Sequence, residues 1–257
     1  MVKFQKERRY VIMINRNKIN DMLWKGKSDK ENHFDVICHF LDYLNSRSSD
    51  FILKGGTSLM VCYQLDRFSE DIDLDSTNKN IERFINDFCK ENGYQVRKAK
   101  DTTTTKRYMI HYSDEHKPLK IEISYRQKRI DSARVTHING VTVYRINELF
   151  GMKINAYNSR DKIRDLYDVV FITKHYIDDI SDERIEVFKD ILSYKGLEQF
   201  DYLIKTQKDE LIDNDKLATD FLEVFDKLEL LDDYELENNI SLEKENDLAD
   251  DFEDREL

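Results

Sequence analysis

The spacing of hydrophobic residues changes once along this chain, and that change limits the fold more than any other feature. Between Gly93 and Gly140, β-branched and aromatic residues dominate in short runs, which predicts successive strands of one sheet. From Ile146 onward, apolar residues recur every three to four positions, which predicts helices. We therefore expect an α+β protein, with a mixed sheet and flanking helices over residues 1–144 and a helical domain with an acidic tail over 145–257.

The sheet is expected to begin before residue 93. An amphipathic helix over 30–44 precedes a short apolar strand, Phe51–Leu53, that stops at Gly55-Gly56. A second strand over 71–75 alternates acidic and apolar residues. Another amphipathic helix is expected over 80–92.

Composition excludes several classes of protein. The chain has 257 residues, 40% hydrophobic and 36% charged, which is enough apolar content to bury a core. No stretch approaches the roughly 20 apolar residues of a membrane helix, and the amino terminus lacks a signal-peptide pattern, so we expect a cytoplasmic protein. The widely spaced Cys38, Cys62 and Cys89 indicate buried thiols rather than a zinc site or disulfides.

Charge is distributed unevenly. Although the formal net charge is −11, residues 1–174 carry 32 Lys and Arg against 24 Asp and Glu, a balance of +8. Residues 175–257 carry 9 against 28, a balance of −19. The basic front part could meet a polyanion, whereas the acidic back part is either a solvated surface or a docking surface for a basic partner.

The first candidate site is a glycine-rich turn between a strand and a helix, Lys54-Gly55-Gly56-Thr57-Ser58-Leu59. Glycine lets backbone N–H groups approach phosphate oxygens because no Cβ intervenes. The new helix, which Thr57 or Ser58 is expected to cap, directs its positive dipole end at them. The turn therefore predicts a phosphate-binding site, although a Gly-Gly pair before a helix often makes only a turn.

Two carboxylates follow on the next strand. Residues two apart on a strand point to the same side, so Asp71 and Asp73 are expected to converge while Ile72 and Leu74 pack into the core. Adjacent carboxylates repel each other unless a cation lies between them, and oxygen ligands favour Mg²⁺ or Mn²⁺. A phosphate site beside a carboxylate-held metal is the equipment for phosphoryl or nucleotidyl transfer.

A third carboxylate is available at Glu122, on a strand whose Ile121 and Ile123 are expected to face the core. If this strand neighbours the Asp71 strand, Glu122 could hold a second metal ion or accept the proton of an attacking hydroxyl. Otherwise Glu122 is a surface residue of an edge strand.

Two later helices, joined by a polar elbow, carry a cationic group made of Lys153, Arg160, Lys162 and Arg164. These side chains could grip a triphosphate or an RNA backbone. They could equally pair across helical turns with Asp161, Asp165 and Asp168.

In combination, these motifs resemble the AbiEii/AbiGii toxin family of nucleotidyltransferases. The matching residues are 54–59, 68–74, Lys153 and 160–168. The resemblance implies a minimal nucleotidyltransferase fold of the DNA polymerase β type, joined to a helical domain, in toxins of toxin–antitoxin or phage-abortive-infection systems. It also implies nucleotide transfer from an NTP to RNA, in some relatives to the 3′ end of tRNA, which stops translation.

The resemblance also implies roles for individual residues. The triphosphate contacts would be Gly55, Gly56, Thr57 and Ser58. Asp71 and Asp73 would hold the metal ions, Lys153 would bind phosphate, and Asp168 would be the acidic residue of the later motif. From its place in the elbow, Arg160 joins the nucleotide-binding residues, and strand alternation adds Glu122 to the catalytic ones.

We therefore predict a Mg²⁺-dependent (or Mn²⁺-dependent) toxin that transfers NMP from an NTP to RNA, with tRNA as the expected acceptor and a cognate antitoxin as a further partner. Two alternatives stay open. The same core could modify a protein or small-molecule hydroxyl, or the chain could be a non-catalytic module that docks a partner. Retention of Asp71 and Asp73 beside the Gly-Gly turn argues against the second alternative.

Overall fold

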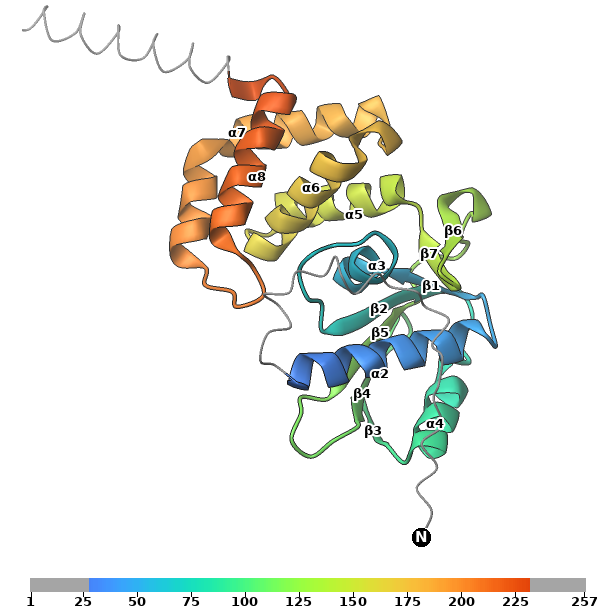
Figure 1. The fold of residues 1–257 in the computed structure, drawn as a ribbon. Coiled ribbons are helices and arrows are strands. Elements are labelled where there is room, and N and C mark those ends of the chain that lie inside the picture. The colour runs from blue at the N-terminus through green and yellow to red at the C-terminus, as the bar shows by residue number, and fades with distance from the viewer. Residues whose placement is uncertain (1–27, 232–257) are drawn as a thin grey trace, which may run out of the picture. The chain divides into compact units, whose positions relative to one another are not determined.

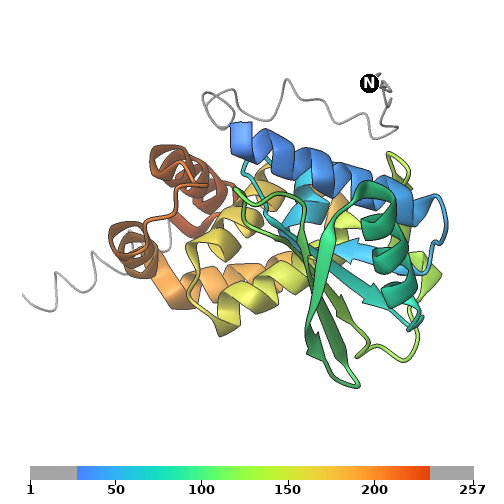
Figure 2. The ribbon, with the colours of Figure 1, turned by 90° about the horizontal axis from the view of Figure 1, so that it is seen from below.

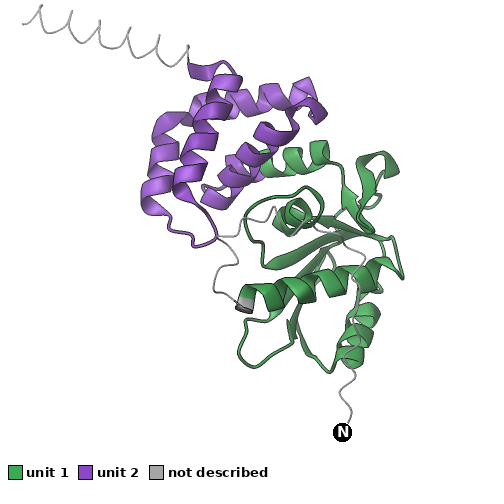
Figure 3. Cartoon of the chain, in the orientation of Figure 1, with its two compact units in different colours: residues 1–155 green, residues 156–257 purple. Residues whose placement is uncertain are grey.

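The computed structural model of this chain describes residues 28–231 and contains two compact units, residues 1–155 and 156–257 (Figures 1 and 3). Helix α5 (Ile146–Ser159) crosses from the first unit into the second. The expected domain boundary at residue 145 stays a prediction. The expected acidic tail lies outside the described residues.

The first unit is built on a seven-stranded mixed sheet with the order β3-β4-β5-β2-β1-β7-β6. The strands are β1 (Phe51–Lys54), β2 (Asp71–Ser76), β3 (Gln95–Asp101), β4 (Thr105–His111), β5 (Leu119–Ser124), β6 (Val135–Ile138) and β7 (Val141–Tyr144). β2 runs parallel to β5 and antiparallel to β1, and β1 runs parallel to β7. The predicted α+β class, with a mixed sheet followed by helices, is confirmed.

One face of this sheet carries the core. Leu53, Ile72 and Ile121 are fully buried there. Helices α2 (Ser28–Asn45) and α4 (Ile81–Asn92) lie on one side of the sheet (Figure 2). The ring centroid of Phe84 on α4 lies 5.7 Å from that of Phe51 on β1, so α4 packs on this apolar face. Because strand residues alternate, the acidic residues of β2 project from the opposite face, which we call the carboxylate face.

The second unit is helical, as expected, and contains α6 (Ile163–Tyr176), α7 (Asp182–Thr206) and α8 (Asn214–Lys227). Helix α7 is the longest of the three, because it continues through a kink at Gly196, where φ is +63°. Glycine adopts this left-handed conformation without a Cβ clash, so the chain bends there and stays helical on both sides. Stacked rings of Phe200 and Phe221, 4.2 Å apart, join α7 to α8.

The sequence predicts one strand of the sheet correctly and misses another. The expected strand that carries Glu122 coincides with β5, and β5 is the parallel neighbour of β2, which carries Asp71. β7 falls in the gap between the last expected strand and the first expected helix. It forms a hairpin with β6 through Asn139-Gly140, both with positive φ, and this dipeptide is a strong hairpin signal.

Candidate active site

The glycine-rich turn and the carboxylate strand are in contact. β1 ends at Lys54, and α3 (Gly55–Cys62) begins at the next residue. Gly55 has a φ of +78°, and a Cβ at this position would lie 2.8 Å from Asp73 Oδ2. A Cβ at Gly56 would lie 2.8 Å from Ser69 Oγ and 2.9 Å from Arg67 Nη2. Only glycine therefore allows the start of α3 to lie this close to β2 and the loop before it.

The expectation that Thr57 or Ser58 caps α3 is wrong. Helix α3 begins at Gly55, before both residues, and its N-cap, Lys54, makes no side-chain capping bond. Thr57 instead donates a hydrogen bond from Oγ1 to the Asp71 carbonyl oxygen, and Ser58 donates from Oγ to the Gly55 carbonyl oxygen at 2.7 Å. These two hydroxyls fix the glycine turn and the first residue of β2 relative to each other.

Asp71 and Asp73 project from the carboxylate face, as the strand alternation predicts. The Asp71 side chain is 43% exposed and forms an ion pair with Lys120, its register neighbour on β5. Burial raises the pKa of Asp73, and repulsion by Asp71 and Glu122 adds to the rise, although Lys120 and Lys54 oppose it. The arrangement therefore concentrates negative charge that a cation would stabilise.

Glu122 lies beside Asp73, because the two residues are paired in the parallel β2–β5 ladder. Its carboxylate accepts a hydrogen bond from Arg107 Nε at 2.7 Å and is ion-paired with Nη2 at 2.5 Å. Arg107 comes from β4, opposite Glu122. Glu122 therefore lies next to the two aspartates, with its oxygen bound to an arginine.

Asp75, the third acidic residue of β2, is not accessible. It is 3% exposed, and its carboxylate accepts hydrogen bonds from Lys54 Nζ at 2.6 Å and Tyr144 Oη at 3.0 Å. Gln127 Nε2 donates a third bond at 3.3 Å. Tyr144 was absent from the predicted site, and Lys54 was part of the predicted glycine-rich turn but was given no role, although its strand pairs with β2.

His33 supports the approach to β2 from α2. Its Nε2 lies 2.8 Å from the Glu70 carbonyl oxygen and its Nδ1 lies 2.6 Å from Tyr112 Oη. A neutral ring satisfies both contacts if Nε2 carries the proton and Tyr112 donates. Burial lowers the pKa of His33, with the Glu70 hydrogen bond opposing this effect, so the neutral form is favoured. No motif in the sequence marked His33.

The donors on β2 suit a divalent metal ion. Asp71 and Asp73 offer carboxylate oxygens on one face, and hard oxygen ligands are those that Mg²⁺ and Mn²⁺ prefer. Within residues 28–231, no group of three or more His, Cys, Asp or Glu side chains is placed to hold a metal ion. Two protein carboxylates completed by phosphate oxygens are the usual arrangement for Mg²⁺ bound with a nucleotide, so the residues present fit it.

The later motif is divided between the two units. Lys153 lies on α5 within the first unit and is 9% exposed, whereas Asp168 lies on α6 of the second unit and is fully buried. Buried charged groups of this kind require partners or a ligand. Both residues stay predictions as site residues.

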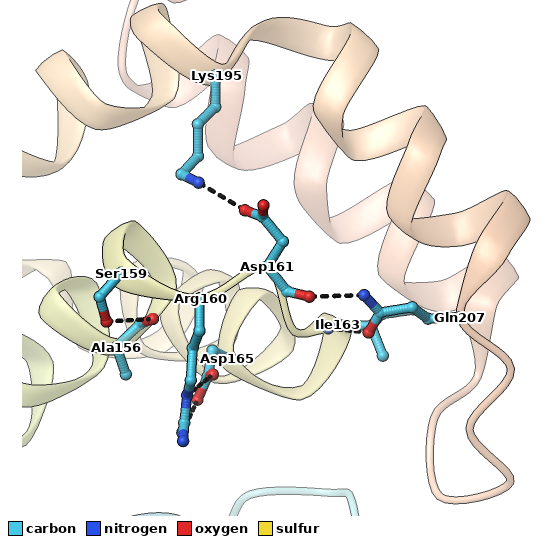
Figure 4. Close-up of polar contacts among 8 residues, drawn as sticks. All are labelled: Ala156, Ser159, Arg160, Asp161, Ile163, Asp165, Lys195 and Gln207. Atoms are coloured by element: carbon cyan, nitrogen blue, oxygen red, sulfur yellow. Dashed lines mark hydrogen bonds and ion pairs between the residues drawn. The ribbon is translucent and has the colours of Figure 1, made fainter.

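The elbow between α5 and α6 is held by ion pairs within the second unit (Figure 4). Arg160 donates two hydrogen bonds to Asp165, at 2.7 and 3.0 Å. Lys195 binds Asp161 at 2.8 Å, and Gln207 bonds both the Asp161 carbonyl oxygen and the Ile163 amide. Part of the cationic group thus pairs with carboxylates, and the Arg160 side chain remains 61% exposed.

Comparisons with known proteins identify a family and two similar structures. The family described as nucleotidyl transferase AbiEii toxin, type IV TA system, matches residues 40–252. The crystal structure of JHP933 from Helicobacter pylori is 27% identical, with a TM-score of 0.67 over 83% of this chain and 98% of that one. A presumed nucleotidyltransferase of H. pylori is 29% identical, with a TM-score of 0.65 over 79% and 98% of the two chains. No curated protein matches the chain.

Proposed function

Because the chain belongs to the AbiEii family of nucleotidyltransferase toxins of type IV toxin–antitoxin systems, we propose that it transfers a nucleoside monophosphate from an NTP to an RNA 3′ hydroxyl. We take tRNA as the expected acceptor. The observation that carries the proposal is the close approach of Gly55 to Asp73 Oδ2, which joins a phosphate-binding helix start to a pair of metal-binding carboxylates.

The first step is binding of the triphosphate. The N–H groups of Gly55, Gly56 and Thr57 at the start of α3 precede the first helical hydrogen bond and suit phosphate oxygens, and Ser58 follows them as the fourth proposed contact. A divalent cation held by Asp71 and Asp73 would neutralise charge on the triphosphate during transfer. Lys153 and Arg160 are proposed as additional phosphate contacts, and Asp168 as the acidic residue of the later motif.

In the transfer itself, the acceptor oxygen forms a bond to the α-phosphorus while the bond from that phosphorus to the pyrophosphate oxygen breaks. The acceptor hydroxyl loses its proton, and Glu122 is the proposed acceptor for it because it lies beside Asp73. Arg107 must then release a Glu122 oxygen or leave the other one available, since it donates only to Oε2.

An RNA acceptor is supported by the +8 balance of residues 1–174, since phosphate backbones bind to Lys and Arg. A cognate antitoxin is expected for a toxin of this family, either a protein or a regulator of expression. In the described part of the chain, no helix is long and apolar enough to cross a membrane.

The test is incubation of the purified full chain with total bacterial RNA, Mg²⁺ and each α-labelled NTP in turn, followed by gel analysis. Wild type should label a discrete RNA band with at least one NTP, and Asp71→Ala should label none. Label in protein instead of RNA would replace this proposal with the protein-acceptor alternative. If no labelling occurs, thermal melting with Mg²⁺ and NTP distinguishes a competent site from a non-catalytic module, which should show no stabilisation.

A further inference from the structure

A cavity of about 510 Å³ lies in the first unit, away from Asp71 and Asp73. We call it the basic cavity; six of its lining residues are Ile52, Lys128, Arg129, Ile130, Val135 and His137. Its volume is within the range of roughly 300–1,000 Å³ that is typical of small-ligand sites.

Strand register places this cavity on the carboxylate face. Ile52 is paired with Asp75, so the two side chains project from the same face of the sheet. Leu53 pairs with Val143, so Thr142 shares the face of Ile52, and His137 pairs with Thr142. The floor of the basic cavity therefore continues the surface that carries Asp71 and Asp73.

The wall of the basic cavity is cationic. Lys128 and Arg129 come from the segment that follows β5, and both side chains are exposed. Within residues 28–231, neither side chain makes a hydrogen bond or an ion pair. The one carboxylate in the lining, Asp50, accepts hydrogen bonds from Ser48 Oγ at 3.1 Å and Asn78 Nδ2 at 2.7 Å. Two cations against one carboxylate leave a net positive charge in the lining, which favours an anionic ligand.

The remaining lining is mixed, with three aliphatic side chains beside the polar residues Ser49, Thr77, Ser132, His137 and Thr142. Ile52 is buried, and Ile130 and Val135 are half-buried. An unstacked nucleotide has the matching composition, with a phosphate for the cations and a flat base for the aliphatic side chains. A basic cavity that also offers three aliphatic side chains and several hydrogen-bonding groups therefore suits a nucleotide of a single-stranded nucleic acid better than a purely anionic small molecule.

The position of the cavity relates it to the transfer site. Ile52 adjoins Asp75, and Asp75 is two residues from Asp73, a span of roughly 7 Å along a strand. Asp75 lies between the transfer site and the basic cavity, and hydrogen bonds from Lys54, Tyr144 and Gln127 hold its carboxylate in place. An RNA whose 3′-terminal hydroxyl lies at Asp73 can therefore place a preceding nucleotide in the basic cavity.

We propose that the basic cavity binds a nucleotide near the 3′ end of the RNA acceptor, with its phosphate at Lys128 and Arg129 and its base against Ile52, Ile130 and Val135. This inference rests on the proposed function, because it assigns an acceptor subsite to the same reaction. It concerns RNA with a single-stranded end and leaves the triphosphate contacts unchanged.

The first test measures binding by fluorescence anisotropy, using the full chain and a fluorescein-labelled 12-nucleotide single-stranded RNA. Lys128→Gln/Arg129→Gln should weaken binding by about tenfold and reduce the salt slope by roughly 0.7, the value for one lost single-strand phosphate contact. The matched control is Lys90→Gln/Arg97→Gln, which removes two exposed cations from α4 and β3, at the opposite edge of the sheet from β6. Equal affinities of the two double variants would overturn the inference.

The second test measures transfer of label from the NTP that wild type uses. Lys128→Gln/Arg129→Gln should raise KM for RNA by about tenfold while KM for the NTP and the melting temperature stay as in the control. If the double variant is active and its KM for RNA is unchanged, the proposed RNA subsite is wrong while the proposed function stands. If wild type labels no RNA with any NTP, the proposed function fails, and the anisotropy result still decides whether the cavity binds RNA. Label found in protein would overturn the assignment of RNA to this cavity.

Discussion

At the scale of single residues, the main feature of the site is how closely its backbone and charged side chains pack around Asp73. Gly55 brings the start of α3 against Asp73, and Asp73 lies between Lys54 and Glu122 in the strand ladders. The raised pKa of Asp73, caused by burial and by neighbouring carboxylates, shows that the folded protein bears a cost for keeping this carboxylate charged. Such a cost is common where a site is arranged for a ligand rather than for stability.

Asp73→Asn should therefore separate stability from activity. We expect transfer to fall by about 10³-fold, since a lost metal ligand removes several kcal/mol of transition-state stabilisation. The free energy of unfolding at pH 7 should rise by about 1 kcal/mol, because a desolvated and repelled charge is gone. Melting without metal, followed by a transfer assay, measures both effects. If Asp73→Asn is less stable than wild type in the absence of metal, the charge of Asp73 does not destabilise the fold and this explanation is wrong.

Gly55→Ala tests the contact between the turn and the carboxylate. The left-handed conformation costs a non-glycine residue about 1–2 kcal/mol, and the new Cβ would meet Asp73 Oδ2 at 2.8 Å. Gly140→Ala is the matched control, because Gly140 has a φ of +80° and nothing lies within 4 Å of an added Cβ. Both variants should lose stability. Only Gly55→Ala should also lose transfer activity, by about 100-fold. Equal activities would show that the contact does not matter for the reaction.

At the scale of elements, the second unit is held by an ion-pair cluster between α6 and α8. Asp220 is 7% exposed and binds Lys174 Nζ at 2.7 Å, and it also pairs with Lys216. Lys174 in turn pairs with Glu223 at 2.5 Å. Burial acts to raise the pKa of Asp220, but its bonds to the two lysines outweigh this and lower it overall.

Because the folded pKa of Asp220 is lowered, its charge stabilises the folded state above the ordinary aspartate value, and this contribution is lost as pH falls through the folded value. Asp220→Asn should cost about 1–2 kcal/mol at pH 7, with Asp226→Asn on the exposed side of α8 as the control. Denaturant titrations from pH 7 down to about 3 should show the difference from wild type shrinking below about pH 4. A difference that stays constant to pH 3 would contradict the assigned cluster.

At the scale of the whole molecule, the two units carry different parts of the predicted motifs. The glycine turn, Asp71, Asp73, Glu122 and Lys153 belong to the first unit, whereas Arg160 and Asp168 belong to the second. Family membership over residues 40–252 spans both units, so the activity is expected to need the full chain.

Expression of the full chain in a bacterium without the cognate antitoxin should stop growth, because nucleotide addition to tRNA would block translation. Asp71→Ala at the same protein level should permit growth. The measurement is optical density after induction, with protein levels checked by immunoblot. Growth arrest by both proteins would assign the toxicity to something other than nucleotidyl transfer.

The sequence predicts the parts of this molecule that are set by local pattern. Alternation along residues 71–75 predicts the shared face of Asp71 and Asp73, because side-chain direction on a strand depends only on position. Glu122 joins them only because β5 pairs with β2, a pairing that the sequence alone left as a condition. The helix start at Gly55 could not be predicted in this way, since the usual hydroxyl cap is replaced by bonds from Thr57 and Ser58 to backbone carbonyls.

Contacts between distant segments are the part that the sequence leaves undetermined. His33 reaches Glu70 and Tyr112, 37 and 79 residues away, and nothing local to His33 marks these partners. The same holds for Arg107 at Glu122 and for Tyr144 at Asp75, which depend on strand order. No motif in the sequence marked Lys128 and Arg129, and only the fold shows that they line a cavity.

The most direct test of the central claim is label transfer from the preferred NTP to purified tRNA whose 3′ ends are either intact or oxidised by periodate. Nucleotidyl transfer to a 3′ hydroxyl predicts labelling of intact tRNA alone, by wild type and not by Asp71→Ala. Equal labelling of intact and oxidised tRNA would contradict the account, because the reaction would then use an acceptor other than the terminal hydroxyl.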